Sequence, residues 1–235
     1  MKVPLFRPKL GKEELKNLAA SFETGWVGAG PRTQELEAQF AQATKTKYAI
    51  GVTSCTAALH IAVQALGIKK GDEVIVPAIT VVSTPYSVLY NGATPVFADV
   101  EADTLCIDPK DIEKKITSKT KAIIPVHLGG HSADMDAIMA IAKKHNLFVI
   151  EDCANAQGAF YKGKPVGSIG DIGCFSFEAK KNMTTGDGGM ITTNDQKLGE
   201  MLKALRWYGS ASDTWKRFAG NNKYSWRYDV QYLGW

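Results

Sequence analysis

Short apolar runs rich in β-branched residues alternate with amphipathic stretches through the first 150 residues, and this alternation restricts the possible folds more than any other feature. Strands are predicted at 48–52, 73–77, 94–100, 121–126 and 147–150. Helices are predicted at 32–44, 55–66, 81–90, 109–115 and 134–145. Strands and helices that alternate at this spacing predict an α/β fold with a mostly parallel sheet.

The pattern changes after residue 152. Short predicted strands at 172–176 and 189–192 bracket a polar, glycine-rich loop, and a predicted helix follows at 196–206. The last stretch, 207–235, is aromatic and basic and has no clear period. It ends without a capping or tail signal, so we expect the chain to be cut short there.

Composition excludes several classes of protein. With 45% hydrophobic residues and a net charge of +4, the chain is expected to be globular and to lack a nucleic-acid partner. The longest uncharged run, 74–98, is broken by prolines and a glycine, so no membrane span is expected, and residues 1–12 do not resemble a signal peptide. The four cysteines show no CxxC spacing, which favours reduced thiols, a cytoplasmic location and no metal site.

Residues 53–56 lie between a predicted strand and a predicted helix. Hydroxyl side chains such as Ser54 and Thr56, together with the free backbone amides of a helix N-terminus, favour an anion such as phosphate. Ser54 could equally serve only as the N-cap of the helix. The loop lacks the Walker pattern and is therefore not an NTPase P-loop.

Two adjacent carboxylates, Glu151 and Asp152, directly follow a buried strand. This position is the carboxyl edge of a parallel sheet, where open α/β folds bind ligands. Because side chains alternate along a strand, the two are not expected to point into one pocket, and one of them is expected to be structural. A role in capping the following helix is an equally open alternative.

Lys180 and Lys181 lie between an aromatic segment and the glycine-rich turn 186–189. A lysine turned inward there can become nucleophilic when burial lowers its pKa, although most lysines are solvated surface charges. The local pattern does not choose between the two lysines.

Together these loops resemble those of the DegT/DnrJ/EryC1/StrS family of sugar aminotransferases, which use pyridoxal 5′-phosphate (PLP). The resemblance covers nearly the whole chain. It rests on the order, spacing and content of the segments GWVGAGPRTQELEAQF, TSCTAALHIAVQALGIKKGDEVIVP, GATPVFADVEADTLCIDP, AIIPVHLGGHSADMDAI, VIEDCANAQGAFYKGKPVGSIGD and CFSFEAKKNMTTGDGGM.

The resemblance implies the large domain of a fold-type I PLP-dependent transferase, an α/β fold with a mixed, mostly parallel sheet flanked by helices. This domain would span 1–235. Residues 1–30 would form an N-terminal arm and loop, and 207–235 would begin the connection to a small C-terminal domain that the chain lacks.

The family's FSF-x-x-x-K pattern places its Schiff-base lysine at Lys181, which the resemblance therefore implies as the catalytic residue that carries PLP as an internal aldimine. Asp152 matches the acidic residue that pairs with the pyridine nitrogen and holds it protonated. Asn155 matches a position near the phenolic oxygen. Ser176 and the loop of Ser54, Cys55 and Thr56 match the positions that hold the phosphate.

Three positions depart from the family pattern. Cys55 stands where glycine is common, and Glu178 stands where histidine is common. Val81 stands where many members place an aromatic residue against the cofactor ring, so the ring would lose a stacking contribution of roughly 0.5–1.5 kcal/mol.

The implied reaction moves an amino group, most simply from glutamate as the amino-acid donor, to a nucleotide-linked keto-sugar, in a homodimer. A PLP-dependent sugar dehydratase is the alternative among enzymes, but that branch of the family has histidine in place of the lysine. A non-catalytic, truncated fragment of the fold is the alternative outside enzymes.

Overall fold

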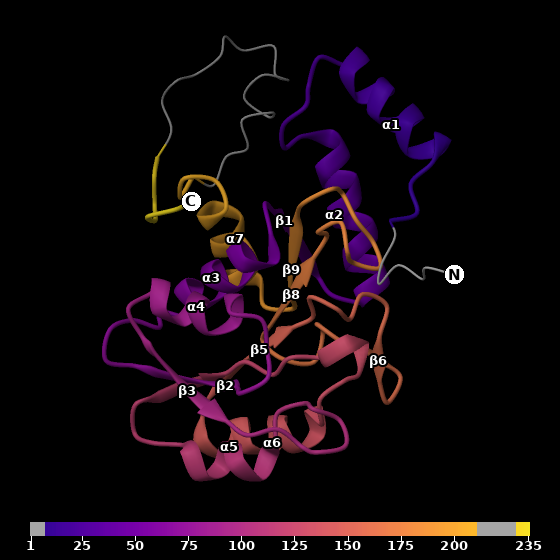
Figure 1. Ribbon diagram of the computed structural model, residues 1–235. Helices are drawn as coiled ribbons and strands as arrows, with labels where there is room; N and C mark the ends of the chain where they lie inside the picture. The colour runs from indigo at the N-terminus through magenta and orange to yellow at the C-terminus, as the bar shows by residue number, and fades with distance from the viewer. Residues whose placement is uncertain (1–7, 211–228) are drawn as a thin grey trace.

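A computed structural model describes residues 8–210 and 229–235, and its centre is a seven-stranded mixed sheet with helices on both faces (Figure 1). The sheet contains β1 (Tyr48–Val52), β2 (Glu73–Pro77), β3 (Thr94–Ala98), β4 (Thr120–Ile123), β5 (Phe148–Asp152), β8 (Ile172–Ser176) and β9 (Gly189–Thr193) in the order β1-β9-β8-β5-β4-β2-β3. Only β9 runs antiparallel to its neighbours. A separate hairpin pairs β6 (Phe160–Tyr161) with β7 (Lys164–Pro165). The predicted α/β fold with a mixed, mostly parallel sheet is confirmed.

The helices follow the predicted order. They are α1 (Lys12–Glu23), α2 (Pro31–Thr44), α3 (Cys55–Ala65), α4 (Ser83–Tyr90), α5 (Pro109–Lys115), α6 (Met135–His145) and α7 (Gln196–Leu205), with a short 3₁₀ helix at Leu128–Gly130. Ser54, Asp134 and Asp195 each begin a helix by accepting a hydrogen bond from a backbone N–H of its first turn. Such caps satisfy donors that have no partner inside the helix.

Alternation along the strands divides the core into two sides. Ile150, Cys174 and Ile191 point toward α3 and α7 and form one apolar cluster. Their strand neighbours point to the opposite side, where Val149 packs in a cluster with α6 and Phe175 and Met190 pack in a cluster with Phe40 of α2. Residues of one parity on β5 and β8 therefore face α3, and residues of the other parity face away from it.

Several predicted boundaries were wrong: the strands predicted at 94–100 and 121–126 end at Ala98 and Ile123, and two further differences affect the site. The helix predicted at 81–90 begins at Ser83, so Val81 precedes it. The strand predicted at 147–150 continues to Asp152, because the backbone N–H of Asp152 donates to Pro125 and Asp152 pairs with Cys174 on β8. Both carboxylates therefore belong to the strand itself rather than to the loop after it.

The end of the described chain packs on α3 and α7. Trp235 donates from Nε1 to Oε1 of Gln64 over 2.7 Å, and its backbone N–H donates to the carbonyl of Leu205 over 2.8 Å. The aromatic stretch predicted to lack a period lies partly outside the described residues, Trp215 and Trp226 included. Among the described helices, none has the length and apolar character needed to cross a bilayer.

Candidate active site

The two carboxylates at the end of β5 point to opposite faces of the sheet. Asp152 has the parity of Ile150 and faces α3 and α4, whereas Glu151 has the parity of Val149 and faces away from α3. Both are almost completely buried, with exposed fractions of 0% for Glu151 and 3% for Asp152. The expectation that they would not share a pocket is confirmed.

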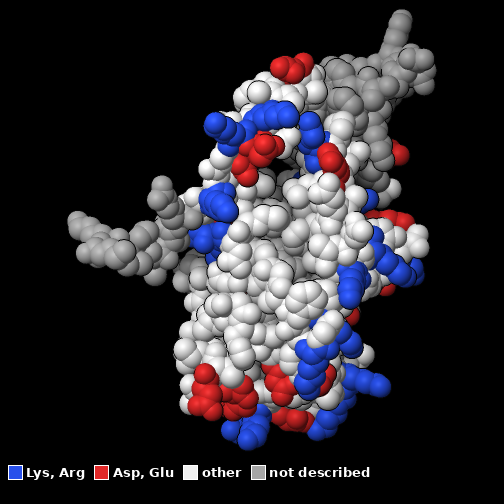
Figure 2. All heavy atoms as spheres, turned by 90° about the vertical axis from the view of Figure 1, so that its right-hand side faces the viewer, with Lys and Arg blue, Asp and Glu red and all other residues white. Residues whose placement is uncertain are grey.

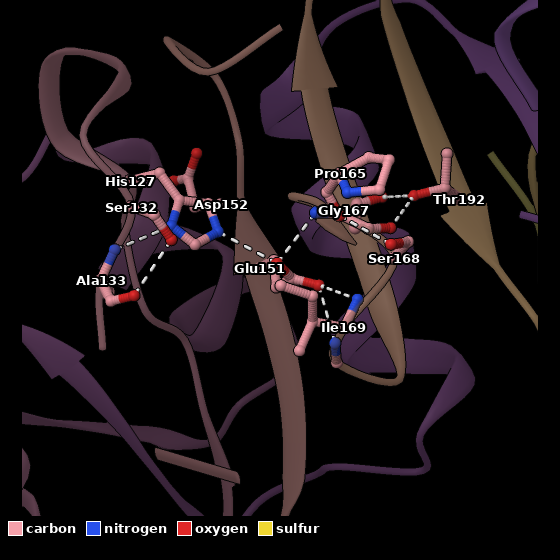
Figure 3. A network of polar contacts seen from close by, with 12 residues as sticks. His127, Ser132, Ala133, Glu151, Asp152, Pro165, Gly167, Ser168, Ile169 and Thr192 are labelled. Atoms are coloured by element: carbon pink, nitrogen blue, oxygen red, sulfur yellow. Dashed lines mark hydrogen bonds and ion pairs between the residues drawn. The ribbon is translucent and has the colours of Figure 1, made fainter. Parts of the chain in front are cut away.

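Glu151 lies at the centre of a closed polar network (Figure 3). Its Oε1 accepts from the backbone N–H groups of Ile169 and Gly170, at 2.8 and 2.7 Å. Its Oε2 accepts from the N–H of Gly167 at 2.8 Å and lies 3.1 Å from Nε2 of His127. Glu151 thus joins β5 to the turn 167–170 and to the segment after β4, and it is the structural member of the carboxylate pair.

The tautomer of His127 follows from its other nitrogen. Nδ1 accepts a hydrogen bond from the backbone N–H of Ala133 at 3.1 Å, so the ring proton lies on Nε2 and is donated to Glu151. His127, Glu151 and Cys153 bring potential metal-ligand atoms within 4.8 Å of one another. Both histidine nitrogens and both glutamate oxygens already have hydrogen-bond partners, so these residues form a structural hydrogen-bond network rather than a metal site.

Asp152 has a different environment. Its Oδ2 accepts from the hydroxyl of Thr84 at 2.8 Å, and its Oδ1 accepts from the N–H of Ala154 at 3.1 Å and lies 4.0 Å from Sγ of Cys55. Burial raises the pKa of the Asp152 carboxyl, and the hydrogen bonds from Thr84 and Ala154 oppose that rise. Within the described residues, none of the ion pairs includes Asp152.

Lys181 reaches the same side of the sheet as Asp152. Its Nζ donates to Oδ1 of Asn155 at 2.7 Å, and its charge acts on both Asp152 and Cys55. Lys180 is exposed, and its Nζ lies 3.9 Å from the carboxylate of Glu178. The structure therefore turns Lys181 inward and Lys180 outward, a choice that the local sequence pattern left open.

The N-terminus of α3 lies beside the end of β8 and the start of β9. Ser54 caps the helix through its hydroxyl, which accepts from the N–H of Ala57 at 3.1 Å. A Cβ atom on Gly189 would come within 2.8 Å of the Cys55 nitrogen, so only glycine fits there. Ser176, at the end of β8, is buried and has the parity of Cys174, which faces α3.

Not every expected residue is enclosed. Val81 is 63% exposed and lies two residues before α4, on the same short segment that brings Thr84 to Asp152. Its expected contact with a cofactor ring stays a prediction. Thr56 is half-buried in the first turn of α3, next to the buried Cys55.

Two polar residues near the site were missed by the sequence analysis. Thr84 is fully buried and contacts Asp152, but a threonine in a predicted helix gives no signal of its partner. Gln157 donates from Nε2 to the carbonyl of Ser176, and its Oε1 is buried without a hydrogen-bond partner in the described part of the chain. Its position five residues after Asp152 was the only available signal.

The described residues fit PLP in their chemistry. Asp152 is a buried carboxylate without an ion-pair partner in residues 8–210 and 229–235, and a protonated pyridine nitrogen would supply the missing cation. The first amides of α3 have no acceptor within the helix, and a phosphate would supply one. Lys181 supplies an amine whose charge acts on both Asp152 and Cys55, the first residue of α3.

Known proteins share this arrangement of elements. The DegT/DnrJ/EryC1/StrS aminotransferase family matches residues 8–230, and the chain therefore belongs to that family. The spore coat polysaccharide biosynthesis protein SpsC of Bacillus subtilis (strain 168) is 46% identical over 232 residues, an alignment that covers 99% of this chain and 59% of SpsC. The chain thus spans less than two thirds of the length of this relative.

Solved structures agree with the family assignment. Spr1654 from Streptococcus pneumoniae in its PLP form has a TM-score of 0.90 at 32% identity, covering 100% of this chain and 62% of that one, and a PMP form has been solved as well. DesI in the presence of its TDP-sugar product has a TM-score of 0.81 at 32% identity, covering 86% of this chain and 52% of that one. The fold is that of PLP-dependent aminotransferases.

Proposed function

We propose that the protein is a PLP-dependent aminotransferase that moves an amino group from glutamate to a nucleotide-linked keto-sugar. The observation that carries this proposal is the placement of Lys181 and Asp152 on one side of the sheet, at the carboxyl edge of β5 and β8. Family membership supports the reaction type. The TDP-sugar product of DesI supports a nucleotide-linked sugar as the substrate class.

PLP supplies an electron sink that stabilises a carbanion next to the amino group being transferred. Asp152 would bind the ring nitrogen and keep it protonated, since a buried carboxylate favours a cationic partner. Asn155 would lie at the phenolic oxygen. Ser176 and the loop of Ser54, Cys55 and Thr56 would hold the phosphate at the N-terminus of α3.

Lys181 would carry the cofactor and then move the proton. Its Nζ already lies in hydrogen-bond contact with Asn155, so the amine has a fixed anchor on the site side of the 178–188 loop. In its uncharged form, Nζ would take a proton from the substrate carbon and return it, as a general base and acid. The lysine at this position disfavours the dehydratase alternative.

An exposed apolar face supports the homodimer. Its side chains belong to α4 and the segments on either side of it, and each is at least 43% exposed: Ile79, Val81, Val82, Tyr86, Leu89, Tyr90 and Phe97. Several exposed apolar side chains on one helix and its flanking segments are typical of a surface that a protein partner covers. We propose that a second copy of the chain covers this face, and the mass measured by sedimentation tests it.

The distribution of charge and the state of the cysteines support two further expectations, small-molecule substrates and a cytoplasmic location. On the face shown in Figure 2, basic and acidic side chains are interspersed around an uncharged middle, without a continuous basic stripe. All four cysteines are free and buried. We propose that the protein is a cytoplasmic enzyme with small-molecule substrates. We also propose that the chain from residue 207 onward begins the connection to a further domain.

The test is the visible absorption spectrum of the purified chain with PLP, recorded before and after addition of glutamate. Lys181→Ala should abolish the band of lysine-bound cofactor, and Lys180→Ala, which changes the neighbouring exposed lysine, should keep it. The band of the unaltered chain should convert when glutamate is added. A band that survives in Lys181→Ala and disappears in Lys180→Ala would contradict the assignment. A band that does not change when glutamate is added would contradict the half-reaction with glutamate and favour the truncated-fragment alternative.

A further inference from the structure

A pair of threonine hydroxyls leads from the edge of the site to Asp152. Thr84, on α4, is fully buried, and its Oγ1 lies 2.8 Å from Oδ2 of Asp152. Oγ1 of Thr80 lies 2.7 Å from Oγ1 of Thr84. Thr80 is only half-buried, so the pair extends from partly accessible surface to the interior.

The direction of these hydrogen bonds follows from the chemistry of the groups. An ionised carboxylate can only accept, so the single proton of the Thr84 hydroxyl is donated to Asp152. Thr84 can then only accept from Thr80, which must donate. The orientation of both hydroxyls is therefore fixed as long as Asp152 is charged.

Asp152 depends on this contact because few other groups compensate its burial. Besides Thr84, its carboxylate has the Ala154 N–H and the distant Cys55 thiol. The charged or titratable groups that interact with it are Lys181, His127 and three buried thiols, those of Cys55, Cys153 and Cys174. Among the contacts that oppose the effect of burial on the Asp152 pKa, the hydrogen bond from Thr84 is the largest.

We propose that Thr84 is a positioning residue that holds the Asp152 carboxylate charged and in place for a cationic ring nitrogen, and that Thr80 orients the Thr84 hydroxyl. The inference deepens the proposed function and rests on it for the identity of the ring. Thr84 acts through Asp152 and contacts no reacting atom.

The experiment compares the unaltered chain with Thr84→Val, Thr84→Ser and Thr80→Val. Valine keeps the shape of threonine and removes the hydroxyl, whereas serine keeps the hydroxyl. Thr44→Val is the matched control, since Thr44 is also buried and donates its hydroxyl to a backbone carbonyl, that of Phe40 at 2.7 Å, away from Asp152.

The first measurement needs no cofactor. Carbon-13 NMR of the aspartate carboxyls follows the titration of Asp152, whose signal is assigned by its loss in Asp152→Asn. Thr84→Val should move the titration midpoint to higher pH, Thr80→Val should move it less, and Thr84→Ser and Thr44→Val should leave it near that of the unaltered chain. The second measurement is the dissociation constant for PLP, which should rise at least tenfold in Thr84→Val, equivalent to about 1.4 kcal/mol.

An unchanged Asp152 midpoint in folded Thr84→Val would overturn the proposal, as would equal shifts in Thr84→Val and Thr44→Val. If Thr84→Val does not fold, an unchanged midpoint in Thr80→Val overturns it instead. Failure of the unaltered chain to bind PLP would count against the proposed function alone, because the titration without cofactor still decides the role of Thr84.

Discussion

Glu151 and Asp152 are neighbours on one strand, yet their buried carboxylates differ in how completely they are hydrogen-bonded. Glu151 accepts four hydrogen bonds, three of them from backbone N–H groups, so each of its carboxylate oxygens has two donors. Asp152 receives two hydrogen bonds within normal distance and has no ion-pair partner in the described part of the chain. Strand alternation over one residue therefore separates a carboxylate with complete hydrogen bonding from a carboxylate that we propose binds a cationic ligand.

The difference shows how burial can serve two purposes. A fully hydrogen-bonded buried carboxylate fixes the backbone segments that donate to it, here 167–170 and the segment of His127. An incompletely compensated one costs folding free energy, and that cost is recovered when a cationic partner binds. Substitutions at the two positions should therefore separate stability from cofactor binding.

The largest effect on stability is expected for Glu151→Gln. The glutamine amide would turn its NH₂ group toward backbone N–H groups whichever way it is placed, because donors face both oxygens of Glu151. We expect the free energy of unfolding, measured by urea denaturation, to fall by about 3–5 kcal/mol, the scale for breaking a buried charge network.

Glu113→Gln is the matched control for this substitution. Glu113 is exposed and pairs with Lys144 and His145 on the surface, so the same chemical change should have little effect on unfolding. Equal losses of stability in the two variants would refute the assignment of Glu151 as the centre of a structural hydrogen-bond network.

Asp152→Asn should have the opposite effect: it should preserve the stability of the cofactor-free protein and weaken the binding of PLP. Because the pKa of Asp152 is raised in the folded protein, the folded state binds more protons than the unfolded state, and stability falls as the pH rises through the interval between the two pKa values. At pH 7 the cofactor-free variant should therefore be as stable as the unaltered chain or more stable, and any advantage should vanish as the pH falls toward about 4. Its affinity for PLP should drop at least tenfold, the scale of a lost charged contact.

Thermal or urea unfolding at several pH values, together with a PLP titration, checks both parts. A cofactor-free Asp152→Asn protein that is much less stable at pH 7 would show that Asp152, like Glu151, serves the fold.

The sequence was sufficient for the fold class and for one aspect of the site. Strand and helix patterns predicted an α/β fold with a mostly parallel sheet, and the family resemblance implied that the sheet is mixed. Strand alternation predicted that Glu151 and Asp152 would point to different faces. Pattern alone could not say which of them was structural, because the four donors to Glu151 come from segments distant in sequence. Thr84 was missed for the same reason, since its partner is 68 residues away. The inward turn of Lys181 likewise depends on Asn155, which belongs to another loop.

The smallest effect is expected for Cys55→Ala, which removes the third and weakest contact to Asp152. Burial raises the pKa of the Cys55 thiol well above its usual range, so the sulfur keeps its proton and can act only as a weak donor, here at 4.0 Å from Oδ1. We expect a loss of about 1 kcal/mol in unfolding free energy, typical of a modest core substitution. The NMR midpoint of Asp152 should shift less than in Thr84→Val. A shift as large as that of Thr84→Val would mean that the thiol, and not the threonine hydroxyl, is the main group that holds the carboxylate charged. The comparison between Glu151 and Asp152 would then extend to α3, because the residue that departs from the family's common glycine would itself contribute to the charge of the site.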